Sequence, residues 1–277
     1  MPHIFSYRDD MLYSHHTIDL RPAQEDFSMH VHEWMEIYFF ISGQASYLVE
    51  GTAYHLQPND ILIMRSAETH TLTISPDEPY ERIAIQFSPA LLASIDPEQR
   101  LLRPFLDRPL GQLNRYAAAE DPTGRLRTAF AGFSFDSVPD IRLNLLARLL
   151  LFLTALDGIY EQAGLPLRVP ARGLPGQLVA YINEHLFEDI SLQTVADHFY
   201  RSRSQISRAF QQATGSPLWE YVTLKRLMAA RAMIQRGESA GSACMACGFS
   251  DYSSFFRSYR THFGHVPRED APKGAGS

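Results

Sequence analysis

Short stretches rich in apolar residues, some of which alternate with polar residues as in 69–74, fill the chain between Ser28 and Phe87. Alternation with a period of two is typical of strands with one buried face, and turn-forming pairs such as Ser42-Gly43 and Glu50-Gly51 separate the stretches. Many short strands at this spacing favour a β-barrel or jelly roll. The predicted strands are 36–41, 45–49, 52–56, 60–64, 69–74 and 81–87.

After Pro89 the apolar residues recur at intervals of three and four, which is the period of an amphipathic helix. Helical stretches are predicted at 90–110, with an interruption at Pro104, and at 140–162. The second carries a broad leucine-rich stripe, which is typical of a helix packed in a core, and a second subunit is an alternative partner for part of it. The prolines of 166–176 indicate a linker, and helical periodicity follows it.

The predicted fold class is α+β with two domains, which suits a chain of 277 residues. Residues 1–165 form a β-barrel with a helical extension, 166–176 form a linker, and 177–270 form an all-α domain. The sequence contains no run of about 18 uncharged apolar residues and no basic-then-apolar start, so we expect a cytoplasmic protein. The two cysteines, Cys244 and Cys247, form no disulfide framework and agree with a reducing compartment.

The second domain contains two predicted helix-turn-helix units. In the first unit, Ser191 begins helix 192–199 and Ser202 begins helix 203–213, where Gln205 completes a capping box. The outward face of this second helix carries donors that can bind base edges and phosphates. Its outward residues are Arg203, Ser204, Ser207, Arg208 and Gln211.

The same pattern recurs at 240–247 and 251–262, with Ser250 as the predicted cap of the second helix. A helix over 217–236 joins the two units, and its twenty residues span about 30 Å. Because B-DNA repeats at roughly 34 Å, the two outer helices have the spacing to enter successive major grooves. The second unit opens with small residues, so we expect an undersized core in which Met245 and nearby aromatic side chains fill part of the gap.

Charge is unevenly distributed along the chain, whose formal net charge is -6. Residues 1–173 carry 14 arginines against 22 acidic residues, whereas 201–268 carry ten basic residues against three acidic ones. A local basic excess is typical of a phosphate-binding surface. A solvated face gives the same count, so charge alone leaves both interpretations open.

Several short motifs follow one another through the second domain: Tyr181-Ile182-Asn183-Glu184-His185, Ser191-Leu192, Val195-Ala196, Arg226-Leu227, Gly248-Phe249-Ser250-Asp251, Phe256-Arg257 and Phe263-Gly264. They resemble the DNA-binding domain of the AraC/XylS family of transcription regulators. The resemblance implies a regulator that binds double-stranded DNA through both units. Gln211 stands where the family usually has a lysine, which removes one phosphate contact. The implied contact residues are Ser204, Ser207 and Arg208 in the first unit, with Arg203 beside them, and Ser253, Ser254 and Arg257 in the second.

The spacing of His30, His32, Glu36, Gly43 and His70 resembles the cupin motif. Regulators of the AraC/XylS family commonly carry a cupin-like barrel, so the resemblance implies that residues 1–165 form a cupin-like domain that binds an effector. The small effector is expected to be a carbohydrate in the first instance.

Alternate positions of this segment carry His30, His32, Trp34 and Glu36. A regular strand would therefore point all four side chains to one face. An effector pocket is the preferred interpretation, in which Trp34 stacks on a sugar ring and polar side chains bind its hydroxyls. Imidazoles with a carboxylate would also suit zinc, nickel or iron, and a hydrogen-bonded barrel interior is the structural alternative. The expected effector-binding residues are His30, His32, Trp34, Glu36, His70 and Arg82.

The sequence shows no phosphate-binding loop, nucleophile triad or other catalytic constellation, so we expect a regulator and not an enzyme. A metal-dependent cupin enzyme is the alternative. No cofactor is expected, while a divalent metal in the barrel pocket is left open. A regulator that binds two half-sites requires a second subunit, so we expect a homodimer formed through 1–165.

Overall fold

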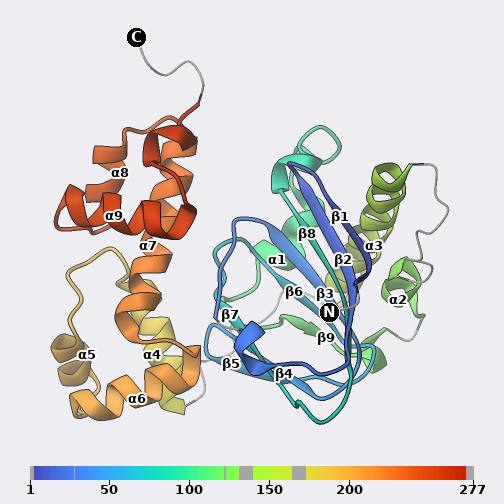
Figure 1. The fold of residues 1–277 in the computed structure, drawn as a ribbon, viewed down its shortest axis with the longest axis horizontal. Helices are drawn as coiled ribbons and strands as arrows, with labels where there is room; N and C mark the ends of the chain where they lie inside the picture. The colour runs from blue at the N-terminus through green and yellow to red at the C-terminus, as the bar shows by residue number, and fades with distance from the viewer. Residues whose placement is uncertain (1–2, 28, 122, 131–139, 164–172, 273–277) are drawn as a thin grey trace. The chain divides into compact units, whose positions relative to one another are not determined.

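The computed structural model describes residues 3–27, 29–121, 123–130, 140–163 and 173–272. The chain forms two compact units, Met1–Pro170 and Ala171–Ser277. All strands belong to the first unit among the described residues, and the second unit is helical (Figure 1). Most of the predicted linker 166–176 lies outside the described residues.

Two antiparallel sheets make up the first unit, with strand orders β1-β2-β8-β3-β6-β9 and β5-β4-β7. Each of the six predicted strands is present within one residue of its expected bounds. The sequence pattern missed β1, β2 and β9. The strands are β1 (His3–Arg8), β2 (Leu12–Asp19), β3 (Met35–Ser42), β4 (Ala45–Val49), β5 (Thr52–His55), β6 (Ile61–Met64), β7 (His70–Ile74), β8 (Tyr80–Phe87) and β9 (Arg115–Tyr116).

Strand β3 separates two apolar cores because its successive side chains point to opposite faces. On one face, Phe39 stacks on Phe130 of α2 (Arg125–Phe130) with ring centroids 4.9 Å apart. On the other face, Tyr38 meets Tyr47 of β4 at 4.8 Å, within a core that lies between the two sheets. The larger sheet is therefore covered by helices on one face and by the smaller sheet on the other.

Helix α3 (Ile141–Ala163) supplies much of the helical cover. Its predicted stripe is confirmed as core, since Leu145, Leu149 and Leu156 have no exposed surface. By length and composition alone the segment Ile141–Gln162 could cross a membrane, a test that a core helix of this kind also passes. Leu143 and Leu151 lie on the solvent side, with 62% and 66% of their surface exposed.

The helical stretch expected at 90–110 is present only as short separate turns. The chain instead forms short 3-10 segments, Pro89–Leu92 and Arg100–Leu102, followed by the single turn α1 (Arg103–Leu106). The carboxylate of Asp96 accepts hydrogen bonds from the backbone N–H groups of Arg100 and Leu101. This side chain replaces helical carbonyls as the acceptor and starts a new turn.

The second unit consists of six helices among the described residues: α4 (Gly173–Glu184), α5 (Leu192–His198), α6 (Arg203–Thr214), α7 (Leu218–Gln235), α8 (Ala240–Ala246) and α9 (Tyr252–Phe263). Helix α4 begins at Gly173, inside the predicted linker. Pro175 fits its first turn, where backbone N–H groups need no helical partner. Helix α9 is capped by Asp251 and not by Ser250.

Large aromatic side chains close the core between α8 and α9. Phe255 and Tyr259 are fully buried against Ala243 and Cys244. The expectation that Met245 fills part of this core is wrong, since 68% of its surface is exposed. Small residues on α8 therefore pack against aromatic residues on α9, which supply the large side chains of this core.

Candidate functional site

Helix α6 is fixed at its start and along one face. The Ser202 hydroxyl accepts a hydrogen bond from the backbone N–H of Gln205, and the Gln205 side chain accepts one from the Ser202 N–H, which is the predicted capping box. Ile206 and Phe210 are fully buried. The opposite face is exposed and carries the predicted residues Arg203, Ser204, Ser207 and Arg208.

Helix α9 repeats this arrangement. The Asp251 carboxylate accepts a hydrogen bond from the Ser254 backbone N–H at 2.7 Å, and hydrogen bonds from Ser254 lower the pKa of Asp251. Ser253 and Arg257 are exposed, and Ser254 is partly exposed. The Arg257 guanidinium donates to the Ser254 hydroxyl at 3.2 Å. Both outer helices thus present an arginine and serines to solvent from a capped and buried base.

Arg226 of α7 connects the α5–α6 helix pair to the α8–α9 helix pair through the segments beside them. The sequence pattern did not reveal this role. Its guanidinium donates to the carbonyls of Leu186, Glu188 and Gly248 at 2.8, 2.7 and 2.6 Å. Gly248 adopts a φ of +78°, and a Cβ there would lie 2.7 Å from the Phe187 carbonyl oxygen. The turn between α8 and α9 therefore approaches the loop after α4 so closely that only glycine fits at position 248.

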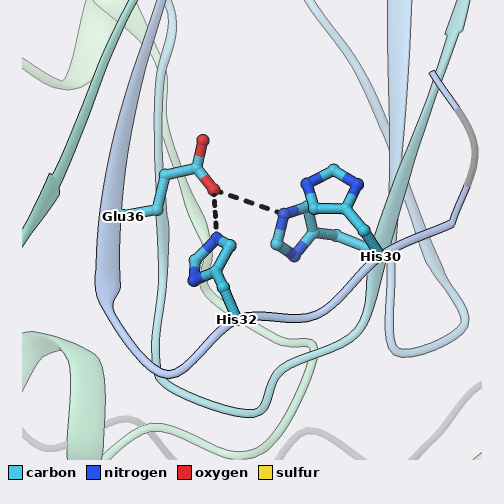
Figure 2. Close-up of side chains that lie close together, drawn as sticks. His30, His32 and Glu36 are labelled. Carbon is cyan, nitrogen blue, oxygen red and sulfur yellow. Dashed lines mark hydrogen bonds and ion pairs between the residues drawn. The ribbon is translucent and has the colours of Figure 1, made fainter. Parts of the chain in front are cut away.

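A cluster of histidines and one carboxylate lies in the first unit, where β3 and β7 meet the segment before β3 (Figure 2). One ligand atom from each of His30, His32, Glu36 and His70 falls within 4.8 Å of the others. The carboxylate oxygen Oε2 of Glu36 lies 2.7 Å from His32 Nε2 and 3.2 Å from His70 Nε2. The structure thus brings together four of the six predicted effector-binding residues.

Backbone carbonyls orient two of these imidazole rings. His32 Nδ1 lies 2.8 Å from the Trp34 carbonyl oxygen, and His70 Nδ1 lies 2.8 Å from the Glu68 carbonyl oxygen. Both Nε2 atoms therefore point at Glu36. Burial alone would raise the pKa of Glu36, but its hydrogen bonds with the two histidines outweigh burial and hold the pKa well below its usual range. Burial lowers the pKa of His70, and Glu36 more than reverses that effect.

Residues 30–36 do not form a regular strand, so the condition under which His30, His32, Trp34 and Glu36 would share one face is not met. His30 makes an isolated antiparallel bridge with His70, the chain bends at Glu33 and Trp34, and β3 begins only at Met35. The bend lets the Trp34 carbonyl accept from His32. Parity in a regular strand is therefore not what gathers these side chains.

Arg82 belongs to a second polar group in the same sheet interior. Its guanidinium pairs with Asp19 of β2 at 2.6 Å and lies over the rings of Phe27 and Tyr80 at 5.2 and 4.8 Å. Burial raises the pKa of Tyr80. The sequence pattern did not indicate Asp19, because a buried carboxylate breaks the apolar alternation that identifies a strand.

Several buried polar atoms of this interior have no hydrogen-bond partner within the described residues. They are the hydroxyls of Thr17, Tyr38 and Tyr80 and the Oδ1 atom of Asp19. Each of these side chains is no more than 3% exposed. A buried polar atom without a partner costs about 1–3 kcal/mol, so a water molecule or polar ligand that paired with these atoms would stabilise this interior.

A separate ion pair braces the wall of this domain. The Arg108 guanidinium donates to Glu68, and both side chains are almost fully buried. The Asn114 amide also donates to Glu68, at 3.1 Å. Burial would raise the pKa of Glu68, but Arg108 lowers it to about 2. This pair ties the loop after α1 to the segment between β6 and β7 that precedes His70.

Family models match both units. The model described as an AraC-like ligand binding domain matches residues 13–131, and the model described as a helix-turn-helix domain matches residues 195–271. Together they cover more than half of the chain. The resemblance of the helical part to a DNA-binding domain and the two-domain fold class are confirmed.

Relatives with curated descriptions include the HTH-type transcriptional activator RhaS. The protein from Enterobacter sp. (strain 638) is 35% identical over 94 residues, which is 34% of this chain and 34% of the relative. The one from Citrobacter koseri is 25% identical over 265 residues, 91% of this chain and 90% of the relative. The first of these matches thus spans about a third of its relative's length. Among solved structures, ToxT from Vibrio cholerae covers 94% of this chain and 97% of its own, with 9% identity and a TM-score of 0.39.

Proposed function

Since the chain belongs to the AraC family of transcription regulators, we propose that it binds specific DNA through α6 and α9 and that a small effector in the sheet domain controls this binding. The observation that carries the proposal is the pair of matched outer faces. Arg208 on α6 and Arg257 on α9 are exposed, and each helix is capped at its start and buried on its inner side.

Arginine suits this role because its fork of donors matches the acceptor atoms of guanine in the major groove. Serine hydroxyls and backbone groups at a helix start bind phosphates and fix the register of the protein on DNA. The proposed contacts are Arg203, Ser204, Ser207 and Arg208 on α6, and Ser253, Ser254 and Arg257 on α9.

Substitution of the two arginines tests the DNA-binding proposal. An operator is first selected from random DNA with the wild-type protein, and affinity is then measured by gel shift for Arg208→Ala and Arg257→Ala. Each should weaken operator binding by about 1–3 kcal/mol, or roughly 5- to 150-fold. Arg236→Ala, an exposed arginine at the end of α7, is the control and should bind as wild type. Unchanged affinity in both test variants would contradict the proposal.

We infer that the effector is a polyhydroxylated molecule of carbohydrate type. Support comes from the unpartnered hydroxyls and carboxylate oxygen between the sheets, which can donate to and accept from sugar hydroxyls, and from aromatic rings beside them. The proposed pocket comprises the predicted residues His30, His32, Trp34, Glu36, His70 and Arg82, extended by Thr17, Asp19, Tyr38 and Tyr80.

Removal of a single unpartnered hydroxyl tests the effector proposal. A thermal-shift screen of sugars against the full chain identifies a ligand that raises the melting temperature. Tyr80→Phe should then weaken that ligand without lowering stability, because the deleted hydroxyl has no partner in the protein. Tyr160→Phe is the matched control, since its buried hydroxyl is also unpartnered but lies on α3. Equal affinity in all three proteins would exclude Tyr80 from the pocket.

We further propose a homodimer formed through the first unit, in the cytoplasm, with no catalytic activity. Exposed Leu143 and Leu151 on α3 support a subunit contact there, and two reading helices per subunit suit a regulator of paired half-sites. Sedimentation of the full chain should give a dimer, and Leu151→Glu should shift it toward the monomer. A wild-type monomer at all concentrations would reject this part of the proposal.

A further inference from the structure

We propose that the sheet domain holds one divalent transition-metal ion, bound by His30, His32, Glu36 and His70. These four residues also belong to the proposed effector pocket, so the ion would lie within that pocket, and its binding does not depend on the proposed DNA binding. Three imidazoles and one carboxylate form a donor set that suits zinc, nickel, cobalt or iron in the divalent state. Their ligand atoms already lie within 4.8 Å of one another, so they converge without a rearrangement of the fold.

The hydrogen-bond roles within the cluster point to a cation. Each of His32 and His70 places Nδ1 at 2.8 Å from a backbone carbonyl oxygen, so Nδ1 carries the proton and donates it. In a neutral imidazole the other nitrogen, Nε2, is then an acceptor only. Both Nε2 atoms nevertheless lie 2.7 and 3.2 Å from the same carboxylate oxygen of Glu36, which is also an acceptor.

Two acceptors attract each other only through something positive between them. One answer is a second proton on each imidazole, which gives two imidazolium ions around a single carboxylate. The other is one dication, which supplies the same positive charge as those two protons. The dication also bonds to His30, whose ring centroid lies 4.2 Å from that of His70, and it accepts lone pairs from all four side chains. The second answer therefore accounts for every member of the cluster.

The distances agree with coordination by a small ion. With bonds of about 2.0–2.2 Å to nitrogen and oxygen, two ligand atoms of a tetrahedral site lie about 3.4 Å apart. The observed distances from Glu36 Oε2 to the two histidine nitrogens, 2.7 and 3.2 Å, are both slightly shorter than this value. The ligand atoms therefore need to move apart by only fractions of an ångström. The Trp34 and Glu68 carbonyls then serve as the outer groups that commonly fix the tautomer of a metal-bound histidine.

The location gives the ion a structural consequence. His30 and His32 precede β3 and lie outside the regular strands, whereas Glu36 belongs to β3 and His70 begins β7. A bound ion would tie this segment to both sheets, because β3 lies in the larger sheet and β7 in the smaller one. Metal binding should therefore raise the melting temperature of the sheet domain.

Cobalt titration of the full, tag-free chain tests the proposal. After dialysis against a chelator, we expect one Co2+ to bind per chain, to survive gel filtration, and to give ligand-field absorption bands in the visible. Zn2+ should displace it and remove the bands. His30→Ala is the principal variant because the His30 side chain is exposed and its loss leaves no cavity. It should weaken cobalt binding about tenfold or more, and Glu36→Gln should do the same.

His55→Ala is the matched control, since His55 is an exposed histidine of the same domain, outside the cluster, and it should bind cobalt as wild type. Circular dichroism and the gel shift are recorded for each variant, so that failure to fold and failure of DNA binding are seen separately from loss of metal. Absence of retained cobalt in the folded wild type would overturn the proposal. Equal loss in His55→Ala, or wild-type binding by His30→Ala and Glu36→Gln together, would overturn it as well.

Discussion

Replacement of Arg226 by methionine offers a quantitative test of how the two helix pairs are held together. Methionine keeps most of the apolar stem but removes every donor of the guanidinium. The carbonyls of Leu186, Glu188 and Gly248 then lose their hydrogen bonds at once. The Leu186 and Glu188 carbonyls belong to the loop between α4 and α5, and the Gly248 carbonyl belongs to the turn between α8 and α9. Both the α5–α6 pair and the α8–α9 pair are therefore affected.

The expected loss is about 4 kcal/mol. The Leu186 carbonyl bond is fully buried, and a buried acceptor without a partner costs about 1–3 kcal/mol. The other two bonds are partly buried, so water can replace the donor and each contributes about 1 kcal/mol. At 1.4 kcal/mol for each tenfold change, amide hydrogen exchange in the slowest-exchanging residues of α4 to α9 should accelerate roughly a thousandfold.

Hydrogen exchange on the full chain measures this change separately for the two units of the protein. Amides of the sheet domain serve as an internal reference and should exchange at the wild-type rate. Arg236→Met, at the exposed end of the same helix, is the control and should change exchange by less than about threefold. Acceleration of less than about tenfold in Arg226→Met would refute the reasoning, because water would then satisfy all three carbonyls as well as the guanidinium does.

Three further results are expected. Glu68→Gln leaves the buried Arg108 without its counter-charge and should destabilise the sheet domain by about 3–5 kcal/mol in urea unfolding, whereas Arg142→Gln, which breaks an exposed pair, should cost under about 1 kcal/mol. Burial raises the pKa of Cys247 to about 11; because only the thiolate is alkylated, native-state labelling should be slow at pH 8 and should rise about tenfold per pH unit up to that pKa, and fast labelling at pH 8 would contradict the assignment. Ala243→Ile should destabilise the helical unit by about 1–3 kcal/mol through overpacking, since Ala243 is fully buried in a filled core; greater stability would reveal a cavity there.

An element could be predicted from the sequence only where apolar residues occupy its buried positions. Strands β3 to β8 are rich in apolar residues and were predicted within a residue of their bounds, and the cap residues Ser191 and Ser202 located the starts of α5 and α6. Strand β2 was missed because its buried positions include Ser14, Thr17 and Asp19, which carry no hydrophobic signal. The same cause hid the Asp19 partner of Arg82, although Arg82 itself was named as a candidate.

The histidine cluster was predicted from spacing, but for a reason that the structure revises. The prediction relied on the shared parity of a regular strand, whereas the chain bends at Trp34 and places the carbonyl of this residue 2.8 Å from His32 Nδ1. The contacts of Arg226 were beyond sequence reasoning, because they join residues 40 and 22 positions away along the chain. The sequence pattern of an amphipathic helix does not distinguish a buried, hydrogen-bonded arginine from one exposed to solvent.

Strand order has a consequence for the protein during its synthesis. Strand β2 pairs on its inner side with β8, and 63 residues separate Asp19 from its partner Arg82. At about 5–20 residues per second on the ribosome, the β1–β2 hairpin waits about 3–13 seconds for the strand that completes it. During that time it presents an unpaired edge, which is a template for aggregation when it is apolar. Serine, threonine and aspartate at its later-buried positions keep that waiting edge hydrated, so the residues that weaken the strand's hydrophobic pattern also protect the nascent chain.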